Sequence, residues 1–249
     1  MALPKIDTPI FDCDLPSNNK KVRFRPFLVK EQKLLLMAAE STEMKDVIQT
    51  IKQVISNCTL DDLDIDSLPV FDIEFLFLNL RARSVGEIVN VKYKCNNIVG
   101  THLDKEGIEQ DKHCNHIVEM DINVLEIEPK FGEGHTTKIE ITKDVGIVMK
   151  YPSYEMIEQM VGKEENQVVF ELLLKCVDYI YDNESIYYSK DFTQAELEEF
   201  VDNLQQEHLD KIKTFFDTMP KVKKMVDFTC TACGYHEDLA IEGIQNFFV

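Results

Sequence analysis

The stretch Asp227–Leu239, DFTCTACGYHEDL, places two thiols three positions apart and follows them with a glycine. The flanking segments, MVDFTC and YHEDLAI, are both strand-like. A hairpin with Cys-x-x-Cys-Gly at its tip is typical of a zinc knuckle, because the tight turn directs both sulfurs inward and glycine tolerates positive φ. We therefore predict that Cys230 and Cys233 form one half of a metal site.

The other half of the predicted site lies in the middle of the chain. Cys95 ends the strand-like segment VKYKC, Cys114 precedes NHIVEMDINV, and a polar loop over residues 96–113 separates them. Structural zinc takes four ligands in a tetrahedron. We therefore predict a structural, four-thiolate zinc site of Cys95, Cys114, Cys230 and Cys233, whose first pair departs from the compact Cys-x-x-Cys spacing.

Other ligands and other cysteine chemistries are the alternatives to four zinc-bound thiolates. His113, His116 and His236 lie beside the thiols and could replace one of them, although the strand pattern favours solvent-facing histidines. A redox dithiol usually opens a helix after a strand, whereas a strand pattern follows Gly234. An iron–sulfur cluster would also use four cysteines.

The three remaining cysteines have no metal role in this interpretation. Cys176 lies on an apolar stripe and is expected in the core, Cys58 is expected near a helix end, and Cys13 is expected in an irregular arm. Seven cysteines without an export signal indicate a reducing compartment, where a disulfide framework is not expected.

Composition limits the classes of partner. The net charge of −18 disfavours nucleic acid and anionic membranes, since both would be bound through Lys and Arg. No apolar run reaches the roughly 20 residues of a membrane helix. The 44% apolar content and 15 Phe predict a folded globule. Without a membrane-length apolar run or a recognisable secretory signal, the protein is expected to be soluble and cytosolic.

Hydrophobic periodicity predicts strands and helices in alternating blocks. The expected elements are a strand near Val22–Phe24, helices over 29–40, 42–58 and 66–84, strands over 87–95, 116–127 and 137–151, and then a helical region. The helix over 66–84 is apolar on nearly every side, and the strand over 137–151 should turn back near Asp144. In the helical region, one stripe contains Val169, Leu172, Leu173, Cys176, Val177 and Ile180, and another runs from Phe200 to Met219.

The predicted fold class is α+β, with helical regions around a split zinc-ribbon-like β element formed by mid-chain and C-terminal strands. We divide the chain into an N-terminal strand and helical region (1–86), a β region with the first half of the ribbon (87–150), a helical insertion (151–220) and the second half of the ribbon (221–249). Because no linker separates them, the regions should form one compact domain.

Catalytic signatures do not stand out in the sequence. It lacks GxSxG, HExxH and a P-loop, and the glycines of FGEGHT (Phe131–Thr136) are not followed by the required lysine. Four thiolates would fill a zinc shell and leave no position for water. A zinc-dependent hydrolase remains the alternative of another class, with three protein ligands and Glu237 or Asp238 as general base.

Four segments together resemble the baseplate hub assembly proteins of T-even-like tailed bacteriophages: LPKIDTPIF, VRFRPFLVKEQKLLLMA, FDIEFLFLNLRARSVGE and VDFTCTACGYHEDLAIEGIQNFFV. The resemblance implies a non-enzymatic morphogenesis protein, in the host cytoplasm during assembly, that assists assembly of the baseplate central hub through protein–protein contacts. A chaperone of the tape-measure protein is the alternative. The expected partners are therefore hub or tape-measure proteins.

Two apolar features are candidate contact surfaces for those partners. The tail ends in Phe247, Phe248 and Val249, which would be exposed unless the tail docks. The all-round apolar helix over 66–84 is the other candidate, although burial in the core of the chain itself is the simpler interpretation.

Overall fold

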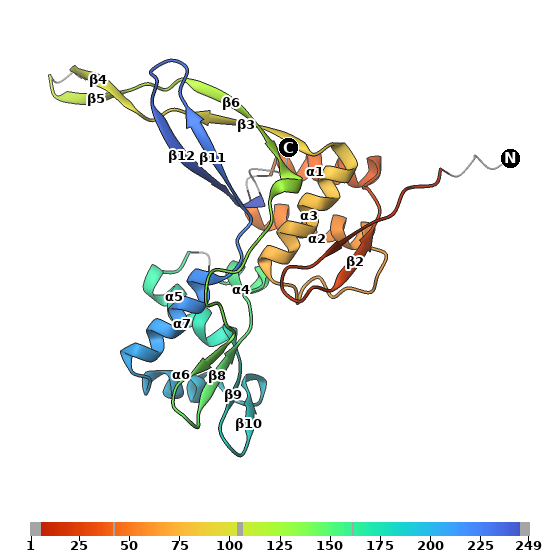
Figure 1. Cartoon of the computed structure of the whole chain (residues 1–249), viewed down its shortest axis with the longest axis vertical. Helices are drawn as coiled ribbons and strands as arrows, with labels where there is room; N and C mark the ends of the chain where they lie inside the picture. Colours follow the sequence, from red (N-terminus) through yellow and green to blue (C-terminus); the bar gives the residue numbers. More distant parts are fainter. Residues whose placement is uncertain (1–5, 42, 104–106, 161, 245–249) are drawn as a thin grey trace.

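The computed structural model describes residues 6–41, 43–103, 107–160 and 162–244. It combines helices with small antiparallel sheets, as expected for an α+β chain. Figure 1 shows three parts: a helical part near the N-terminus, an arm of long hairpins, and a second helical part with its own sheet. Phe247, Phe248 and Val249, predicted to bind partners, lie outside the described residues.

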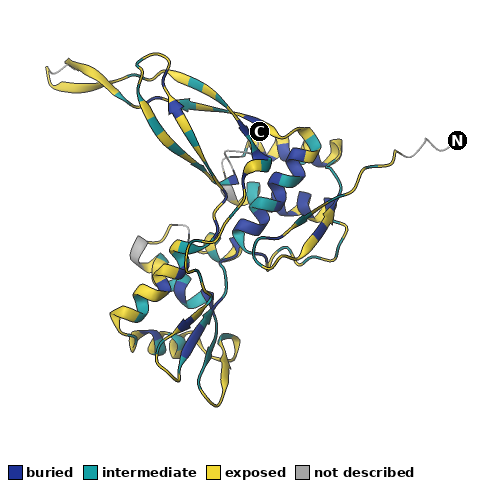
Figure 2. Ribbon diagram, in the orientation of Figure 1, coloured by how far each residue is buried: buried dark blue, intermediate teal, exposed yellow. Residues whose placement is uncertain are grey.

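The N-terminal part packs three helices against a short hairpin. Its elements are β1 (Phe11–Asp14), β2 (Lys21–Phe24), α1 (Val29–Ala39), α2 (Met44–Cys58) and α3 (Val70–Val85). Apolar faces of all three helices meet β2 in one buried core, which Figure 2 shows in dark blue. Cys58 ends α2 as predicted. The prediction that Cys13 lies in an irregular segment is wrong, because Cys13 is on strand β1 and pairs with Val22 of β2.

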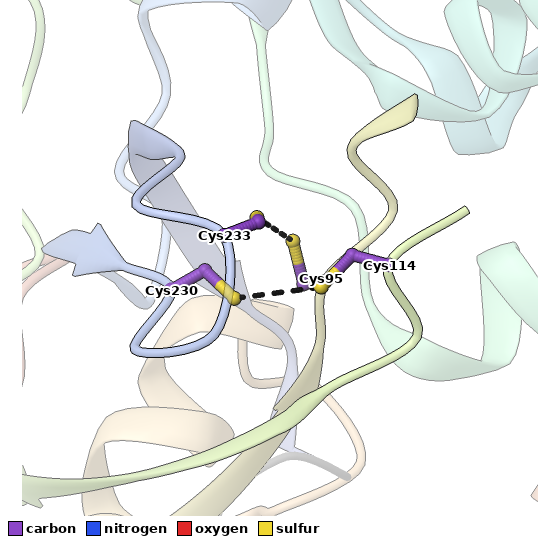
Figure 3. Close-up of side chains that lie close together, drawn as sticks. All are labelled: Cys95, Cys114, Cys230 and Cys233. Carbon is purple, nitrogen blue, oxygen red and sulfur yellow. Dashed lines mark hydrogen bonds between the residues drawn. The ribbon is translucent and has the colours of Figure 1, made fainter. Parts of the chain in front are cut away.

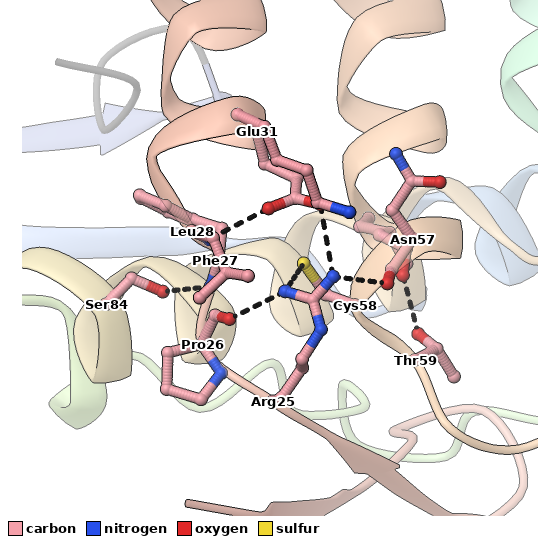
Figure 4. A network of polar contacts seen from close by, with 11 residues as sticks. Arg25, Pro26, Phe27, Leu28, Glu31, Asn57, Cys58, Thr59 and Ser84 are labelled. Atoms are coloured by element: carbon pink, nitrogen blue, oxygen red, sulfur yellow. Dashed lines mark hydrogen bonds and ion pairs between the residues drawn. The ribbon is translucent and has the colours of Figure 1, made fainter. Parts of the chain in front are cut away.

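A buried charge network ties the start of α1 to the end of α2 (Figure 4). The Arg25 guanidinium donates to Glu31 Oε1 at 3.1 Å, to the Asn57 carbonyl at 2.9 Å and to the Pro26 carbonyl at 3.0 Å. Glu31 also accepts the Leu28 N–H at 2.8 Å. Burial alone would raise the pKa of Glu31, but the donors from Arg25 and Leu28 outweigh it and leave that pKa below its usual range.

Helix α3 is buried over most of its length because it packs in the N-terminal core and also contacts the other two parts of the molecule. Phe77 lies in the N-terminal core, Leu78 lies in a second core at the base of the arm, and the Phe71 ring packs edge-on against Tyr151 of the second helical part at 5.1 Å between ring centroids. The prediction of a buried helix is therefore confirmed. The helix is apolar on nearly every side because different faces pack against the N-terminal core, the base of the arm and the second helical part.

The arm contains three antiparallel hairpins. Its strands are β3 (Ile88–Lys94), β4 (Ile98–Leu103), β5 (Glu109–His113), β6 (Ile117–Asn123), β11 (Lys223–Thr229) and β12 (His236–Glu242), paired β3–β6, β4–β5 and β11–β12. The β3–β6 and β11–β12 hairpins are separate sheets that pack through apolar side chains, among them Val91, Val226 and Ile241.

Two expectations for this region differ from the structure. Residues 96–113 were expected to be a polar loop, but most of them form the β4–β5 hairpin, which is exposed on both faces. A strand is usually recognised from the alternation of apolar and polar residues that a buried face requires. Neither face of this hairpin is buried, so its strands lack that alternation and resemble a polar loop in the sequence. The strand expected over 116–127 ends at Asn123 and continues as a short 3-10 turn, η1 (Val124–Glu126).

The second helical part packs four helices on a four-stranded sheet. Its elements are β7 (Lys138–Glu140), β8 (Gly146–Met149), α4 (Tyr154–Glu158), α5 (Glu165–Cys176), β9 (Val177–Tyr181), β10 (Ile186–Tyr188), the 3-10 turn η2 (Ser189–Asp191), α6 (Gln194–Asp202) and α7 (Gln206–Thr218). The strand order is β10-β9-β8-β7, and the turn expected near Asp144 joins β7 to β8.

One helical stripe was predicted too long. Helix α5 ends at Cys176, and Val177 and Ile180 lie on strand β9 instead. The segment VDYIY has β-branched and aromatic residues that favour a strand, and its apolar positions continue the helical spacing by coincidence. Cys176 is buried in the core of this part, as predicted. The division of the chain into four regions stays a prediction.

Glu74 lies where the three parts meet. It accepts a hydrogen bond from the Tyr154 hydroxyl of α4 at 3.0 Å and another from the backbone N–H of Ile244, which follows β12. Nearby, the Val70 N–H donates to the Pro152 carbonyl at 3.1 Å. Burial raises the pKa of Glu74 to about 7, and the neighbouring charge of Glu242 adds to that effect.

We expect Glu74 to make stability depend on pH. Between the ordinary carboxyl pKa of about 4.3 and the folded value of about 7, the folded state keeps a proton that the unfolded state has released. Stability from this group is therefore present below about pH 4 and is lost as pH rises toward 7. Glu74→Gln should be more stable than wild type by about 1–3 kcal/mol at pH 8 and should lose this advantage near pH 4.5.

Urea unfolding of Glu74→Gln and wild type at several pH values between 4.5 and 8 tests this expectation. The exposed Glu133→Gln is the matched control, because it removes the same charge without the buried partners. A constant difference in stability between Glu74→Gln and wild type over that range would show that Glu74 is not the titrating group.

Candidate metal centre

The four cysteines occupy equivalent positions on two hairpins of the arm. Cys95 directly follows β3 and Cys230 directly follows β11. Cys114 stands three residues before the start of β6, and Cys233 stands three residues before the start of β12. Each hairpin therefore presents one thiol at the end of its first strand and one at the approach to its second.

The backbone of the C-terminal hairpin closes a tight knuckle around its two thiols. The Cys230 N–H donates to the Tyr235 carbonyl at 2.8 Å, and the Gly234 N–H donates to the Cys230 carbonyl at 2.9 Å. The Tyr235 N–H donates to the Cys233 sulfur. Gly234 has φ of +71°, which is the conformation predicted for the glycine after the second thiol.

The mid-chain hairpin repeats this pattern with a different sequence. The Cys95 N–H donates to the His116 carbonyl at 2.8 Å, and the Asn115 N–H donates to the Cys95 carbonyl at 2.9 Å. The His116 N–H donates to the Cys114 sulfur, and Asn115 has φ of +56°. The segment Cys114–His116 thus matches Cys233–Tyr235, and the β4–β5 hairpin takes the place of the two residues between the thiols of the other knuckle.

The four sulfurs converge between the two knuckles (Figure 3). Cys95 Sγ lies 3.8 Å from Cys233 Sγ, and Cys114 Sγ lies 3.7 Å from Cys230 Sγ, so each short contact joins the two hairpins. All four sulfurs lie within 4.8 Å of one another. These distances are far longer than the roughly 2.05 Å of a disulfide, so the thiols are not cross-linked.

Apolar side chains pack against the thiol cluster. Cys95 and Cys230 are buried, and Cys114 and Cys233 are half-buried. The fully buried Phe228 packs edge-on against Tyr93 with 4.8 Å between ring centroids. These apolar side chains come from both hairpins and join them next to the thiols.

The thiols differ in how readily they ionise. Burial raises the pKa of Cys95 to about 12, because a thiolate is poorly solvated there. The Tyr235 N–H aimed at its sulfur lowers the pKa of Cys233 to about 7, and the Asn97 side chain also donates to that sulfur. Cys233 is therefore deprotonated more easily than an ordinary thiol, and the thiolate is the form that binds metals.

The nearby histidines point to other partners. His116 Nε2 lies 3.0 Å from Thr231 Oγ1, His236 Nδ1 lies 3.0 Å from Asp227, and His113 Nδ1 lies 2.7 Å from a backbone carbonyl. In the described part of the chain, the one cluster of possible metal ligands contains the four cysteines and no histidine.

Of the two carboxylates considered for a hydrolase, Glu237 is held by hydrogen bonds. Glu237 accepts hydrogen bonds from Tyr93 at 3.3 Å and from Tyr235 at 3.4 Å, so its carboxylate is engaged with the two tyrosines. Asp238 lies opposite Asp227 in the β11–β12 ladder.

Comparison with known proteins places the chain in a phage family. A family model described as T4 bacteriophage base plate protein matches residues 8–249. The chain belongs to this family. No curated protein and no solved structure gives a significant match. Membership indicates a structural or assembly role in the baseplate, with other baseplate proteins as partners. None of the described helices of this baseplate protein is long and apolar enough to span a membrane.

The knuckle glycine provides a test of the backbone geometry. Gly234→Ala should lower the free energy of unfolding by about 1 kcal/mol, because a side chain is disfavoured at this φ. A Cβ there would meet no described atom within 4 Å, so the cost comes from the backbone alone. Gly234→Asn should cost less, since Asn tolerates this conformation better.

Urea titrations followed by circular dichroism measure both changes. Asn115→Gly is the reciprocal control and should be tolerated, because it places glycine at the equivalent position of the other knuckle. If Gly234→Ala proved as stable as wild type, the positive φ at this position would be wrong.

Proposed function

We propose that this chain is a non-enzymatic phage morphogenesis protein that assists assembly of the tail baseplate central hub through protein–protein contacts. We further propose that one structural Zn²⁺, bound by Cys95, Cys114, Cys230 and Cys233, holds its arm together. The observation that carries the zinc proposal is the convergence of two pairs of sulfurs from hairpins more than a hundred residues apart in sequence.

The spacing of the sulfurs fits zinc. With Zn–S bonds of about 2.3 Å, a tetrahedron places neighbouring sulfurs about 3.8 Å apart. The two short contacts of 3.8 and 3.7 Å agree with this length, and the widest separation, within 4.8 Å, requires a contraction of about 1 Å. An iron–sulfur cluster fits less well, because four cysteines around a core of several atoms must stand further apart.

The donor set supports a structural and not a catalytic ion. Four thiolates complete the preferred shell of zinc and leave no position for an activated water. A hydrolase would need one of these ligands replaced and a general base, whereas Glu237 is held by two tyrosines. The thiolates would be further stabilised by the N–H groups of Asn97, His116 and Tyr235, which donate to three of the four sulfurs.

The arm is the part of the molecule that needs such an ion. Isolated two-stranded hairpins are marginally stable in water. The β3–β6 and β11–β12 hairpins are joined by a thin layer of side chains, in which Phe228 is the largest fully buried member. A structural zinc contributes roughly 10–16 kcal/mol of apparent binding energy that is coupled to folding.

We expect the protein purified from cells to contain one zinc per chain. Cys233→Ser and Cys95→Ser should each lower the zinc content below about one tenth of an equivalent, because three thiolates hold zinc less tightly than four. Each change should also lower the apparent melting temperature by about 10 °C or more. Elemental analysis and thermal unfolding measure the two effects.

Cys13→Ala is the matched control, because Cys13 lies on the β1–β2 hairpin and outside the thiol cluster. It should retain the full equivalent of zinc. A wild-type protein that contained no metal and whose stability did not change with chelators would contradict the structural zinc site.

We also expect direct binding to baseplate hub proteins of the same phage. Pairwise co-expression and affinity capture with each hub protein, and separately with the tape-measure protein, test this expectation. Capture of a hub protein supports assistance to hub assembly, and capture of the tape-measure protein alone favours the chaperone alternative. Binding to neither class would contradict the proposed function.

A further inference from the structure

The second helical part carries a groove that its own side chains leave open. Helices α5 and α6 each contribute one face to a hollow of about 450 Å³. The residues from α5 have helical spacing and include Phe170, Glu171 and Leu174, while α6 contributes Glu198, Val201 and Asp202. A neighbouring hollow shares Glu171 and Leu174 with it and is also lined by Ser189 and Lys190, so the groove continues toward η2.

The floor of the groove is apolar and partly uncovered. Val201 is buried and Leu174 is half-buried between the helices, but 51% of Phe170 is exposed to solvent. Phe192, at the η2 end, is 38% exposed. Large apolar side chains gathered along one groove mark a contact surface for another molecule.

The two ends of the groove carry opposite charge. Glu198 and Asp202 lie at the end that contains Val201, where both are exposed. The adjoining hollow at the other end is lined by Lys150, Lys163, Lys175 and Lys190 and by two carboxylates, Glu155 and Glu171, the second of which pairs with Lys163. The four lysines of this hollow outnumber its two carboxylates, so this end of the groove is locally basic on a protein whose net charge is −18.

We propose that this groove binds an amphipathic helix of a baseplate partner. Basic residues of that helix would lie beside Glu198 and Asp202, and its acidic residues would lie beside Lys175 and Lys190. A third helix packs naturally between two helices, because its apolar ridge fits the groove that they form. The opposed charges at the ends would fix the direction of the bound helix. This inference rests on the proposed function, since it names the surface that contacts a baseplate protein.

Binding measurements with the full chain test the groove. The partner is whichever hub or tape-measure protein the wild-type chain captures. Phe170→Glu should weaken that complex at least tenfold, because it places a charge on the apolar floor. The double change Glu198→Lys and Asp202→Lys, which alters exposed side chains and leaves the core intact, should weaken it at least threefold and change its salt dependence.

Met37→Glu is the matched control, because Met37 is a 71% exposed apolar residue on α1 in a different part of the molecule. It should bind the partner as wild type does, and thermal unfolding shows that each variant is folded. If wild type binds and the groove variants bind equally well, the groove proposal is overturned and the proposed function stands. If wild type binds neither class of protein, both fail.

Cross-linking identifies what occupies the groove. A photo-reactive phenylalanine analogue at position 170 should cross-link to a partner segment with apolar residues at helical spacing and basic residues toward one end. Mass spectrometry of the cross-linked peptide locates that segment. A cross-link to a second copy of this chain, to residues 245–249 of the same chain, or to a partner segment without this pattern would overturn the proposal.

Discussion

The meeting of four thiols from two distant hairpins is the constraint on which the shape of the arm depends. The β3–β6 and β11–β12 hairpins belong to separate sheets, and apolar side chains join them at the base and behind the thiols. At the ends of these hairpins, Cys95 and Cys114 lie opposite Cys233 and Cys230. The repeated backbone pattern of the knuckles holds each pair in place, so a shared ion would need little rearrangement of either hairpin.

The mid-chain knuckle also explains how a third hairpin can extend beyond the thiols. In the mid-chain knuckle, the β4–β5 hairpin stands where the other knuckle has a two-residue turn between its cysteines. The β4–β5 hairpin therefore begins and ends beside the thiols, where the β3–β6 ladder ends and the β4–β5 ladder begins. Its strands are exposed on both faces and have no core of their own. The hairpin is therefore held by its own backbone ladder and by its base between Cys95 and Cys114.

The sequence was informative where a local pattern has one physical meaning. Cys-x-x-Cys-Gly between strands predicts a knuckle, and an apolar helix with few polar interruptions predicts burial, as α3 shows. It was uninformative where the cause is tertiary. Asn115 has the same role as Gly234, yet nothing in the sequence singles it out before the backbones are compared. Val177 and Ile180 fit a helical period, and only pairing with β8 shows that they belong to a strand.

The separation of the molecule into parts has a consequence for how it could act in assembly. A long arm and a grooved helical part meet through α3, where Glu74, Tyr154 and the backbone of Ile244 link the three parts. Binding is strongest when both partners are already ordered, because less conformational freedom is lost on association. An arm whose hairpins meet at the thiol cluster and a groove between two packed helices are both ordered surfaces of this kind. The arm and the groove lie on different hydrophobic cores, so a substitution in one should leave the structure of the other unchanged. A partner that contacts both would depend on the contacts of α3 for the relative positions of the two surfaces.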